Sequence, residues 1–302
     1  MTPTASVTRE VQVTPVPPDP SNAQGFVPWP VPFRFARGPA SAGTTLPRQP
    51  QRLLRRLLRL LEGCSVFAAL LVAWFIAAEY LPLGDNPLIP APPLVLRALI
   101  DSLPELWAGT LSSFSILVPG FALATTAGIV SGLAVGSSRH LANAFLPVAK
   151  VAAPVPPTVY IPYAIAILPT FKLSAIFVVF IGAFWPVFQN AVAGAHALEQ
   201  RYRDNAAILG LSGFEYRWRV VFPAALPHIF AGMAVGLGFS FILLTVAELF
   251  GANAGLGRFV QYYADFADYP RMVAGILYTG LVTWLAMSGL DFLRRRALFW
   301  HQ

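Results

Sequence analysis

The chain has 302 residues, of which 56% are hydrophobic and only 12% are charged, and its net charge is +7. Roughly a quarter of the residues of an ordinary soluble domain are charged, so this composition excludes a soluble globular protein and favours a chain surrounded mainly by lipid. The positive charge does not indicate a nucleic-acid partner, because the arginines lie at the ends of apolar stretches and form no single basic patch.

The N-terminal 50 residues differ from the rest of the chain. They hold 11 of the 28 prolines and show no apolar periodicity. Such a segment cannot bury enough apolar surface to offset the entropy of ordering, so we expect residues 1–50 to form a disordered, proline-rich cytoplasmic tail. Residues 51–302 are then the membrane domain.

Six apolar stretches are each long enough to cross a hydrocarbon core of about 30 Å as a helix. The sequence therefore predicts an all-α integral membrane protein with six transmembrane helices. Between the first two spans, residues 94–106 are predicted to form a short amphipathic helix at the outer membrane surface. The predicted spans run at about 64–83, 112–135, 144–168, 173–195, 227–250 and 272–293.

The second predicted span carries Gly128, Gly132 and Gly136 at a spacing of four residues. This spacing aligns three positions without side chains on one helix face and lets another helix backbone approach closely. Packing within the same subunit is the simpler interpretation, and a seam between two subunits is the alternative.

The third predicted span, 144–168, is interrupted by prolines. Proline removes a backbone donor and clashes with the preceding turn, so we expect a kinked helix here. Membrane helices accept such kinks where a neighbour or a cavity satisfies the freed backbone groups. The prolines are Pro147, Pro154, Pro156, Pro157 and Pro162.

Lysines and arginines lie mainly on one side of the predicted membrane. With the N-terminus inside, 17 of the 21 basic residues fall on the N-terminal side and only Arg97, Lys172, Arg258 and Arg271 fall on the other. Because cytoplasmic segments carry the excess of Lys and Arg, both termini are predicted to be cytoplasmic.

The segment between the fourth and fifth spans, 196–226, is too polar to lie in lipid. Asp204 can cap a short helix of small, helix-compatible residues, and Gly210 is a typical stop. Pro223 then marks the approach to the fifth span. Residue types alone leave two interpretations open, a helix that docks into a cleft of a cytoplasmic partner and a helix that lies on the membrane surface.

This loop resembles the loop motif of the permease subunits of binding-protein-dependent ABC importers. That motif reads Glu-Ala-Ala, three residues, Gly, nine residues, Ile, one residue, Leu-Pro. The chain has Asp204-Asn205-Ala206, three residues, Gly210, nine residues, Val220, one residue, Phe222-Pro223. The spacing agrees throughout, and the replacements keep charge or approximate bulk except at Asn205.

Three further stretches resemble the nitrate, sulfonate, taurine and bicarbonate branch of that superfamily, in the same order. The resemblance implies a type I ABC importer permease fold with a cytoplasmic coupling helix. The stretches are Pro154-Val155-Pro156-Pro157 with Ile161-Pro162, then Phe184-Trp185-Pro186-Val187-Phe188-Gln189-Asn190, and Ala247-Glu248-Leu249-Phe250-Gly251 with Gly255-Leu256-Gly257.

The same resemblance implies the partners and the location. It implies a bacterial inner-membrane homodimer of permease subunits, two cytoplasmic ATPase subunits and an extracytoplasmic solute-binding protein that delivers a small solute such as nitrate, sulfonate, taurine or bicarbonate. ATP and Mg²⁺ are expected on the ATPase and no cofactor on this chain, whose two lysines, Lys150 and Lys172, end no Gly-rich phosphate-binding run. The residues expected to dock on the ATPase are Asp204, Asn205, Ala206, Ala207, Gly210, Leu211, Tyr216 and Pro223.

Glu248 is the only acid well inside a predicted span. An ionisable group within the membrane is a functional candidate because its burial is costly. We expect Glu248 to act as a gate or to have a structural role. In a structural role, its carboxylate would accept hydrogen bonds from the backbone of the turn 251–257. Tyr160, Trp185, Gln189 and Asn190 are further candidates for lining the pathway, although the polar groups can equally bond a neighbouring helix.

The sequence shows no Ser, His and Asp set, no paired carboxylates at catalytic spacing and no metal-ligand cluster, which disfavours an enzyme. A secondary transporter or channel that works without an ATPase is the alternative. It should show repeat symmetry or several charged residues within the spans, and the sequence has neither. A membrane scaffold is a third, weaker interpretation.

Overall fold

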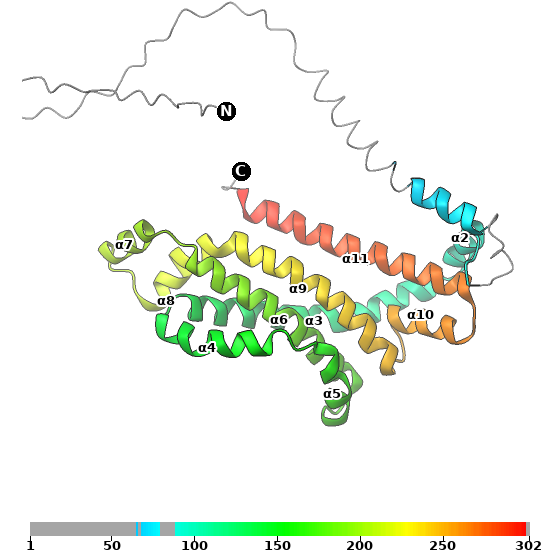
Figure 1. The fold of residues 1–302 in the computed structure, drawn as a ribbon, viewed down its shortest axis with the longest axis horizontal. Helices are drawn as coiled ribbons and strands as arrows, with labels where there is room; N and C mark the ends of the chain where they lie inside the picture. The colour runs from blue at the N-terminus through cyan, green and yellow to red at the C-terminus, as the bar shows by residue number, and fades with distance from the viewer. Residues whose placement is uncertain (1–64, 66–67, 79–87, 300–302) are drawn as a thin grey trace, which may run out of the picture. The chain divides into compact units, whose positions relative to one another are not determined.

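The structure, a computed structural model, describes residues 65, 68–78 and 88–299 (Figure 1). The predicted tail, 1–50, and much of the first predicted span, 64–83, lie outside the described residues. An apolar helix covers Ala68–Ala78. The helices that follow are α2 Pro92–Asp101, α3 Leu103–Gly136, α4 Arg139–Ala152, η1 Pro157–Tyr160, α5 Ile161–Ile167, α6 Phe171–His196, α7 Gln200–Ile208, α8 Gly213–Tyr216, η2 Arg217–Val221, α9 Phe222–Gly251, α10 Leu256–Asp265 and α11 Tyr269–Ala297.

Four helices of the described residues are long and apolar enough to cross a membrane. They are α3, α6, α11 and the continuous helix Gly213–Gly251, which comprises α8, η2 and α9. These helices contain the second, fourth, fifth and sixth predicted spans, and each extends beyond the predicted ends. The protein is therefore an all-helical, multi-pass membrane protein in its described part. Six spans stay a prediction, because the helix Ala68–Ala78 is short.

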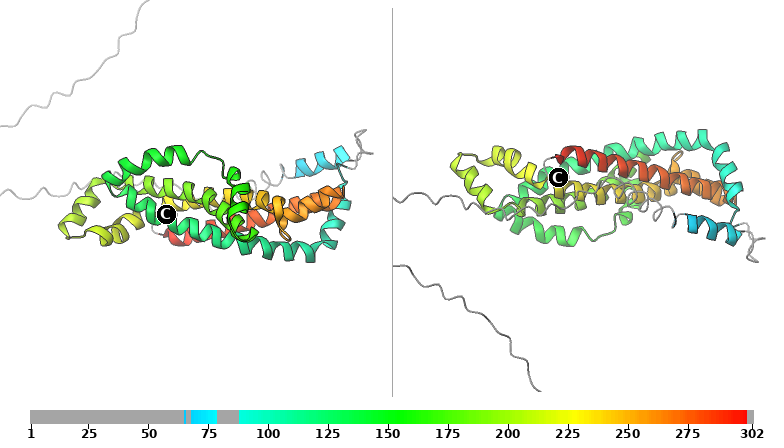
Figure 2. Two further views of the ribbon diagram at one scale, coloured as in Figure 1. Left: turned by 90° about the horizontal axis from the view of Figure 1, so that it is seen from below. Right: turned by 90° about the horizontal axis from the view of Figure 1, so that it is seen from above.

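The third predicted span is not a single kinked helix. α4 and the segment Pro157–Ile167 meet at a bend of 81°, so together they make at most one broken span (Figure 1, Figure 2). Pro154, Pro156 and Pro157 lie in this bend and offer no backbone N–H. The clustered prolines thus produce a much sharper change of direction than the kink predicted from the sequence.

The predicted interfacial helix, 94–106, is divided in the structure. α2 ends at Asp101, Ser102 has φ −93° and ψ 0°, and α3 begins at Leu103. Pro104 accounts for the break, because it has no backbone N–H with which to continue α2 and it suits the first turn of a new helix. The helix that contains the second predicted span therefore begins at Leu103, before the predicted start of the span at 112.

The glycines of α3 pack against α6 of the same subunit, which confirms the simpler interpretation of their spacing. A Cβ atom at Gly132 would lie 2.6 Å from the Cβ of Ala191, and one at Gly136 would lie 2.7 Å from that of Ala195. Gly128 lies equally close to α6. The two backbones can approach to this distance only where one helix has no side chains.

Gly132→Ala is expected to destabilise the protein by about 1 to 3 kcal/mol, the usual cost of overpacking. The new methyl group would lie 2.8 Å from the carbonyl oxygen of Phe188 as well as against Ala191. Thermal unfolding in detergent measures the loss. Gly280→Ala is the matched control, since it is also a helical glycine and no described atom lies within 4 Å of its added Cβ. Equal unfolding temperatures for the two variants would contradict the close packing of α3 against α6.

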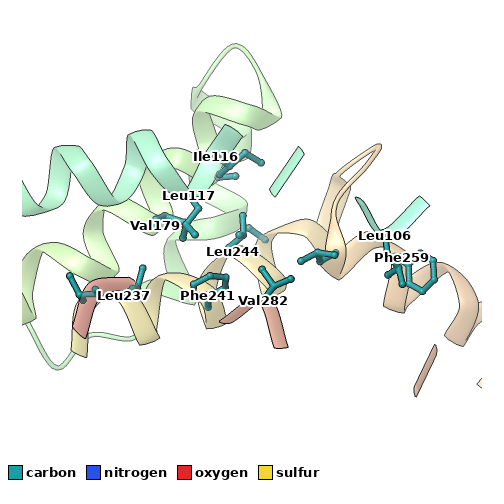
Figure 3. Packing of buried hydrophobic residues seen from close by; sticks show 13 residues of the cluster. Leu106, Ile116, Leu117, Val179, Leu237, Phe241, Leu244, Phe259 and Val282 are labelled. Atoms are coloured by element: carbon teal, nitrogen blue, oxygen red, sulfur yellow. The ribbon is translucent and has the colours of Figure 1, made fainter. Parts of the chain in front are cut away.

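α9 packs against α6 through a second set of small residues. A Cβ atom at Gly232 would lie 2.7 Å from the Cβ of Asn190, and one at Gly194 would lie 2.8 Å from the Cβ of Ala225. α3, α6 and α9 thereby form a common apolar core, to which α10 and α11 also contribute. Its buried residues include Leu106, Ile116, Leu117, Val179, Leu237, Phe241, Leu244, Phe259 and Val282 (Figure 3).

Candidate functional site

A short helix follows the fourth span as predicted, but it begins earlier. α7 starts at Gln200, and the side chain of its N-cap residue, Glu199, makes no capping hydrogen bond. Asp204 lies within the helix and accepts a hydrogen bond from Gln200 Nε2 at 2.8 Å. The prediction that Asp204 caps the helix is therefore wrong, because the residues before it, 200–203, are themselves helical and Gln200 supplies a partner one turn away.

The end of α7 is where the sequence predicted it. Gly210 has φ +69° and its N–H donates to the carbonyl of Ala207. The N–H of Leu211 donates to the carbonyl of Ala206 at 2.9 Å. This pair of bonds closes a helix around a residue in the left-handed region, which glycine adopts without strain from a Cβ atom.

The C-terminal end of α7 presents an apolar surface. Ile208 and Leu209 are 83% and 73% exposed, whereas Ala206 is only 3% exposed. Large apolar side chains that stand exposed together indicate contact with another protein or with lipid. Among the predicted docking residues, Asp204, Asn205, Ala207 and Gly210 are exposed, Leu211, Tyr216 and Pro223 are half-buried, and Ala206 is buried.

Specific contacts attach this loop to the spans. Arg203 donates to the carbonyl of Ala195, at the end of α6, at 3.5 Å. Tyr216 packs against a buried cluster that includes Val221 at the start of the fifth span. The helix Gly213–Gly251 has 39 residues. It is therefore roughly 58 Å long, about twice the thickness of a bilayer core, so part of it extends beyond the membrane.

Glu248 lies near the other end of this long helix and is 1% exposed. Ser113 Oγ on α3 donates to its Oε1 at 2.6 Å, and the backbone N–H of Gly257 on α10 donates to its Oε2 at 2.7 Å. Ser113 Oγ also accepts the N–H of Leu256 at 3.0 Å. The carboxyl group therefore connects α3, α9 and the first turn of α10, and one of its bonds goes to the backbone turn suggested by the sequence.

Two glycines leave space for this carboxyl group. Gly255 has φ +145°, and a Cβ atom there would clash with the carboxyl group of Glu248. A Cβ atom at Gly257 would lie 2.6 Å from the carbonyl oxygen of Thr245. Sequence reasoning missed Ser113, because several hydroxyl residues stand near it and nothing in their spacing singles it out.

The other pathway candidates lie apart from the Glu248 network. Trp185 lines an apolar cavity of about 420 Å³ formed by α3, α4 and α6. Asn190 donates to a carbonyl of its own helix at 2.9 Å. Gln189 is exposed on α6, and Tyr160 is half-buried at the end of η1. These four residues occupy different settings, so their role in a pathway stays a prediction.

A second cavity, of about 400 Å³, lies beside the Glu248 network where α3 meets α10. Figure 1 shows α10 and α7 at opposite ends of the helix bundle. Glu105 and Arg258 both line this cavity, together with the polar side chains of Asn253 and Tyr262. We name it the outer pocket, because the topology predicted from the basic residues has α10 on the extracytoplasmic side.

A tyrosine holds the carboxylate of Glu105. Tyr263 Oη donates to Glu105 Oε2 at 3.0 Å, and the guanidinium of Arg271 lies 5.3 Å from the centre of the tyrosine ring. Burial, followed by the hydrogen bond with Glu105 and its charge, raises the pKa of Tyr263 above its ordinary value. The hydroxyl therefore keeps its proton at neutral pH and continues to donate.

Comparison with known proteins agrees with the resemblance carried by the loop. Residues 124–298 match the family of the binding-protein-dependent transport system inner membrane component. The nitrate import permease protein NrtB of Synechocystis sp. is 30% identical over 251 residues, which cover 78% of this chain and 88% of the relative.

Two other relatives are named for the transport of different solutes. The taurine transport system permease protein TauC of Escherichia coli is 32% identical over 244 residues, covering 78% of this chain and 88% of TauC. The bicarbonate transport system permease protein CmpB of Synechococcus elongatus is 32% identical over 190 residues, covering 62% and 67%. The chain therefore belongs to the permeases of binding-protein-dependent ABC importers, in the branch that contains the nitrate, taurine and bicarbonate systems.

Proposed function

We propose that this chain is the membrane-spanning subunit of an ATP-driven importer that moves a small oxyanion or amino-sulfonate across a bacterial inner membrane. The observation that carries the proposal is α7, an exposed helix with a closed C-terminus at the position of the family's loop motif. The solute class rests on relatives named for nitrate, taurine and bicarbonate transport. The assembly comprises two permease copies, two ATPase subunits that bind ATP and Mg²⁺, and a solute-binding protein.

In the proposed mechanism, α7 docks on the ATPase and passes its movement to the long helix Gly213–Gly251. This helix carries the docking loop near one end and Glu248 near the other. Because Glu248 is bonded to both α3 and α10, tilting the helix also displaces the elements around the outer pocket. ATP binding then shifts the equilibrium between two arrangements of the helix bundle, because the ATPase makes different contacts with α7 in each arrangement.

Copurification tests the proposal directly. The permease is co-expressed with its cognate ATPase, purified as a complex and assayed for ATP hydrolysis with and without loaded solute-binding protein. We expect a stable complex with two copies of each subunit whose hydrolysis rises when the loaded binding protein is added. Solute movement through proteoliposomes that contain the permease alone would instead support a secondary transporter or channel.

The proposed topology has six spans and both termini in the cytoplasm. Single cysteines introduced at Leu209 and at Asn253, in a chain whose native Cys64 is replaced by serine, test it with a thiol reagent that does not cross membranes. We expect labelling of intact cells at Asn253 only, since the two residues lie on opposite sides in this topology. Labelling at Leu209 only would reverse the orientation.

A further inference from the structure

The outer pocket is lined by one basic and one acidic side chain, Arg258 from α10 and Glu105 from α3. The ion pairs found among the described residues join Arg201 to Glu199, Arg219 to Glu215 and Arg271 to Asp268, so none of them uses Arg258. Its guanidinium lies 5.9 Å from the ring centre of Tyr262, a contact that leaves its N–H donors available.

The carboxylate of Glu105 can also accept further hydrogen bonds. Tyr263 donates to Oε2 alone, at 3.0 Å, and the side chain of Glu105 is exposed. A carboxylate accepts several hydrogen bonds, so its other oxygen can take a donor from a bound molecule.

The loop beside these side chains is held in place from behind. Ser112 Oγ donates to the carbonyl of Ala254 at 3.1 Å, and Ser113 Oγ accepts the N–H of Leu256. A Cβ atom at Gly109 would lie 3.3 Å from the carbonyl carbon of Gly255, so α3 and the loop touch through their backbones. A pocket wall fixed in this way needs little ordering when a ligand binds.

We propose that the outer pocket binds a small zwitterionic substrate, with Arg258 bonding its oxyanion group and Glu105 bonding its ammonium group. The inference rests on the proposed function and narrows its substrate class to amino-sulfonates and related zwitterions. A guanidinium matches an oxyanion with two parallel hydrogen bonds, and the pocket volume of about 400 Å³ lies in the range of small-molecule sites. A simple anion such as nitrate would gain from Arg258 but would be repelled by Glu105.

Saturation-transfer NMR on the assembled permease–ATPase complex, without solute-binding protein, provides the test. Taurine is the probe, because its methylene protons report weak binding, and nitrate is added as the competitor. For the wild-type complex we expect a taurine signal that nitrate displaces poorly.

Variants at the two charged positions sharpen the result. Arg258→Gln is expected to weaken taurine binding about tenfold or more, the effect of losing a hydrogen bond between charged groups, and Arg258→Lys to recover part of it. Glu105→Gln is expected to weaken taurine binding while making nitrate the better competitor, a change of selectivity that loss of folding would not produce. Arg97→Gln is the matched control, since Arg97 is an exposed arginine predicted on the same side but does not line the pocket.

Three results would overturn the inference. Taurine binding that is unchanged in both Arg258→Gln and Glu105→Gln is one, and equal displacement by nitrate in the wild type and in Glu105→Gln is another. The third is loss of solute-binding-protein docking in these variants with taurine binding intact, which would make the pocket a protein interface. ATP hydrolysis of each variant complex is measured separately with loaded solute-binding protein added, so a complex that assembles and responds to binding protein but does not bind taurine contradicts only the pocket.

Discussion

Replacing Glu248 with alanine is expected to lower the free energy of unfolding by about 2 to 6 kcal/mol. The change leaves the hydroxyl of Ser113 and the N–H of Gly257 buried without their acceptor. Each unsatisfied buried group costs about 1 to 3 kcal/mol. Denaturant unfolding in mixed micelles, followed by tryptophan fluorescence, measures the difference. We also expect α10 to become more accessible to protease, because its first turn loses its anchor on α9.

Two controls separate this network from a general effect of removing charge. Glu248→Gln keeps an oxygen for one donor but places an NH₂ group against the other, so we expect an intermediate loss. Glu199→Ala removes an exposed acid at the opposite end of the bundle and should stay within about 0.5 kcal/mol of wild type. If Glu248→Ala unfolds like Glu199→Ala, the network does not stabilise the fold.

Ile208→Asp is expected to weaken binding of the permease to its ATPase about 30-fold, the effect of losing one central anchor of about 2 kcal/mol. Ile208 is 83% exposed, so the change should leave the permease itself folded. A charge at the end of α7 would have to be buried in the docking cleft, which costs free energy unless a partner charge is present. Titration of purified ATPase against the variant in nanodiscs measures the affinity.

Phe214→Asp is the matched control for this variant. Phe214 is a similarly exposed apolar residue, 69% exposed, in the same loop, but it lies on α8 beyond the end of α7. We expect the larger loss of affinity for Ile208→Asp. Wild-type affinity in Ile208→Asp would exclude α7 as the docking element. Ala206 is less suited to this test, because it is 3% exposed and a larger side chain there would disturb the loop.

The ends of the spans show where reasoning from hydropathy stops. Four of the predicted spans lie inside long apolar helices, yet α3 begins at Leu103 and the helix that contains the fifth predicted span begins at Gly213, well before the predicted starts. Hydropathy reports how much of a helix prefers lipid, and it cannot detect the polar turns that continue the same helix outside the membrane. The bend of 81° in the third span also depends on how three prolines act together, which single-residue rules do not predict.

The sequence also predicts the two parts of the candidate site, α7 and the Glu248 network, to different extents. The sequence identifies Gly210 as the stop of α7, because a helix end depends on neighbouring residues and on one positive φ angle. The true N-cap residue of α7, Glu199, carries no distinctive capping signal, so the sequence points to Asp204, which lies inside the helix. Glu248 stood out as an acid in an apolar span, but its partner Ser113 lies 135 residues away in the chain. No local pattern connects two positions so far apart.

The sequence alone determined that this is a membrane protein, which family it resembles and where the loop with the family motif lies, because composition, apolar runs and motif spacing are local properties of the chain. The tertiary structure alone decided that Glu248 is bonded to Ser113 and Gly257, and that Glu105 and Arg258 share one pocket. These pairings arise where α3 and α10 meet beside the end of α9, and that meeting depends on how small residues let whole helices pack together.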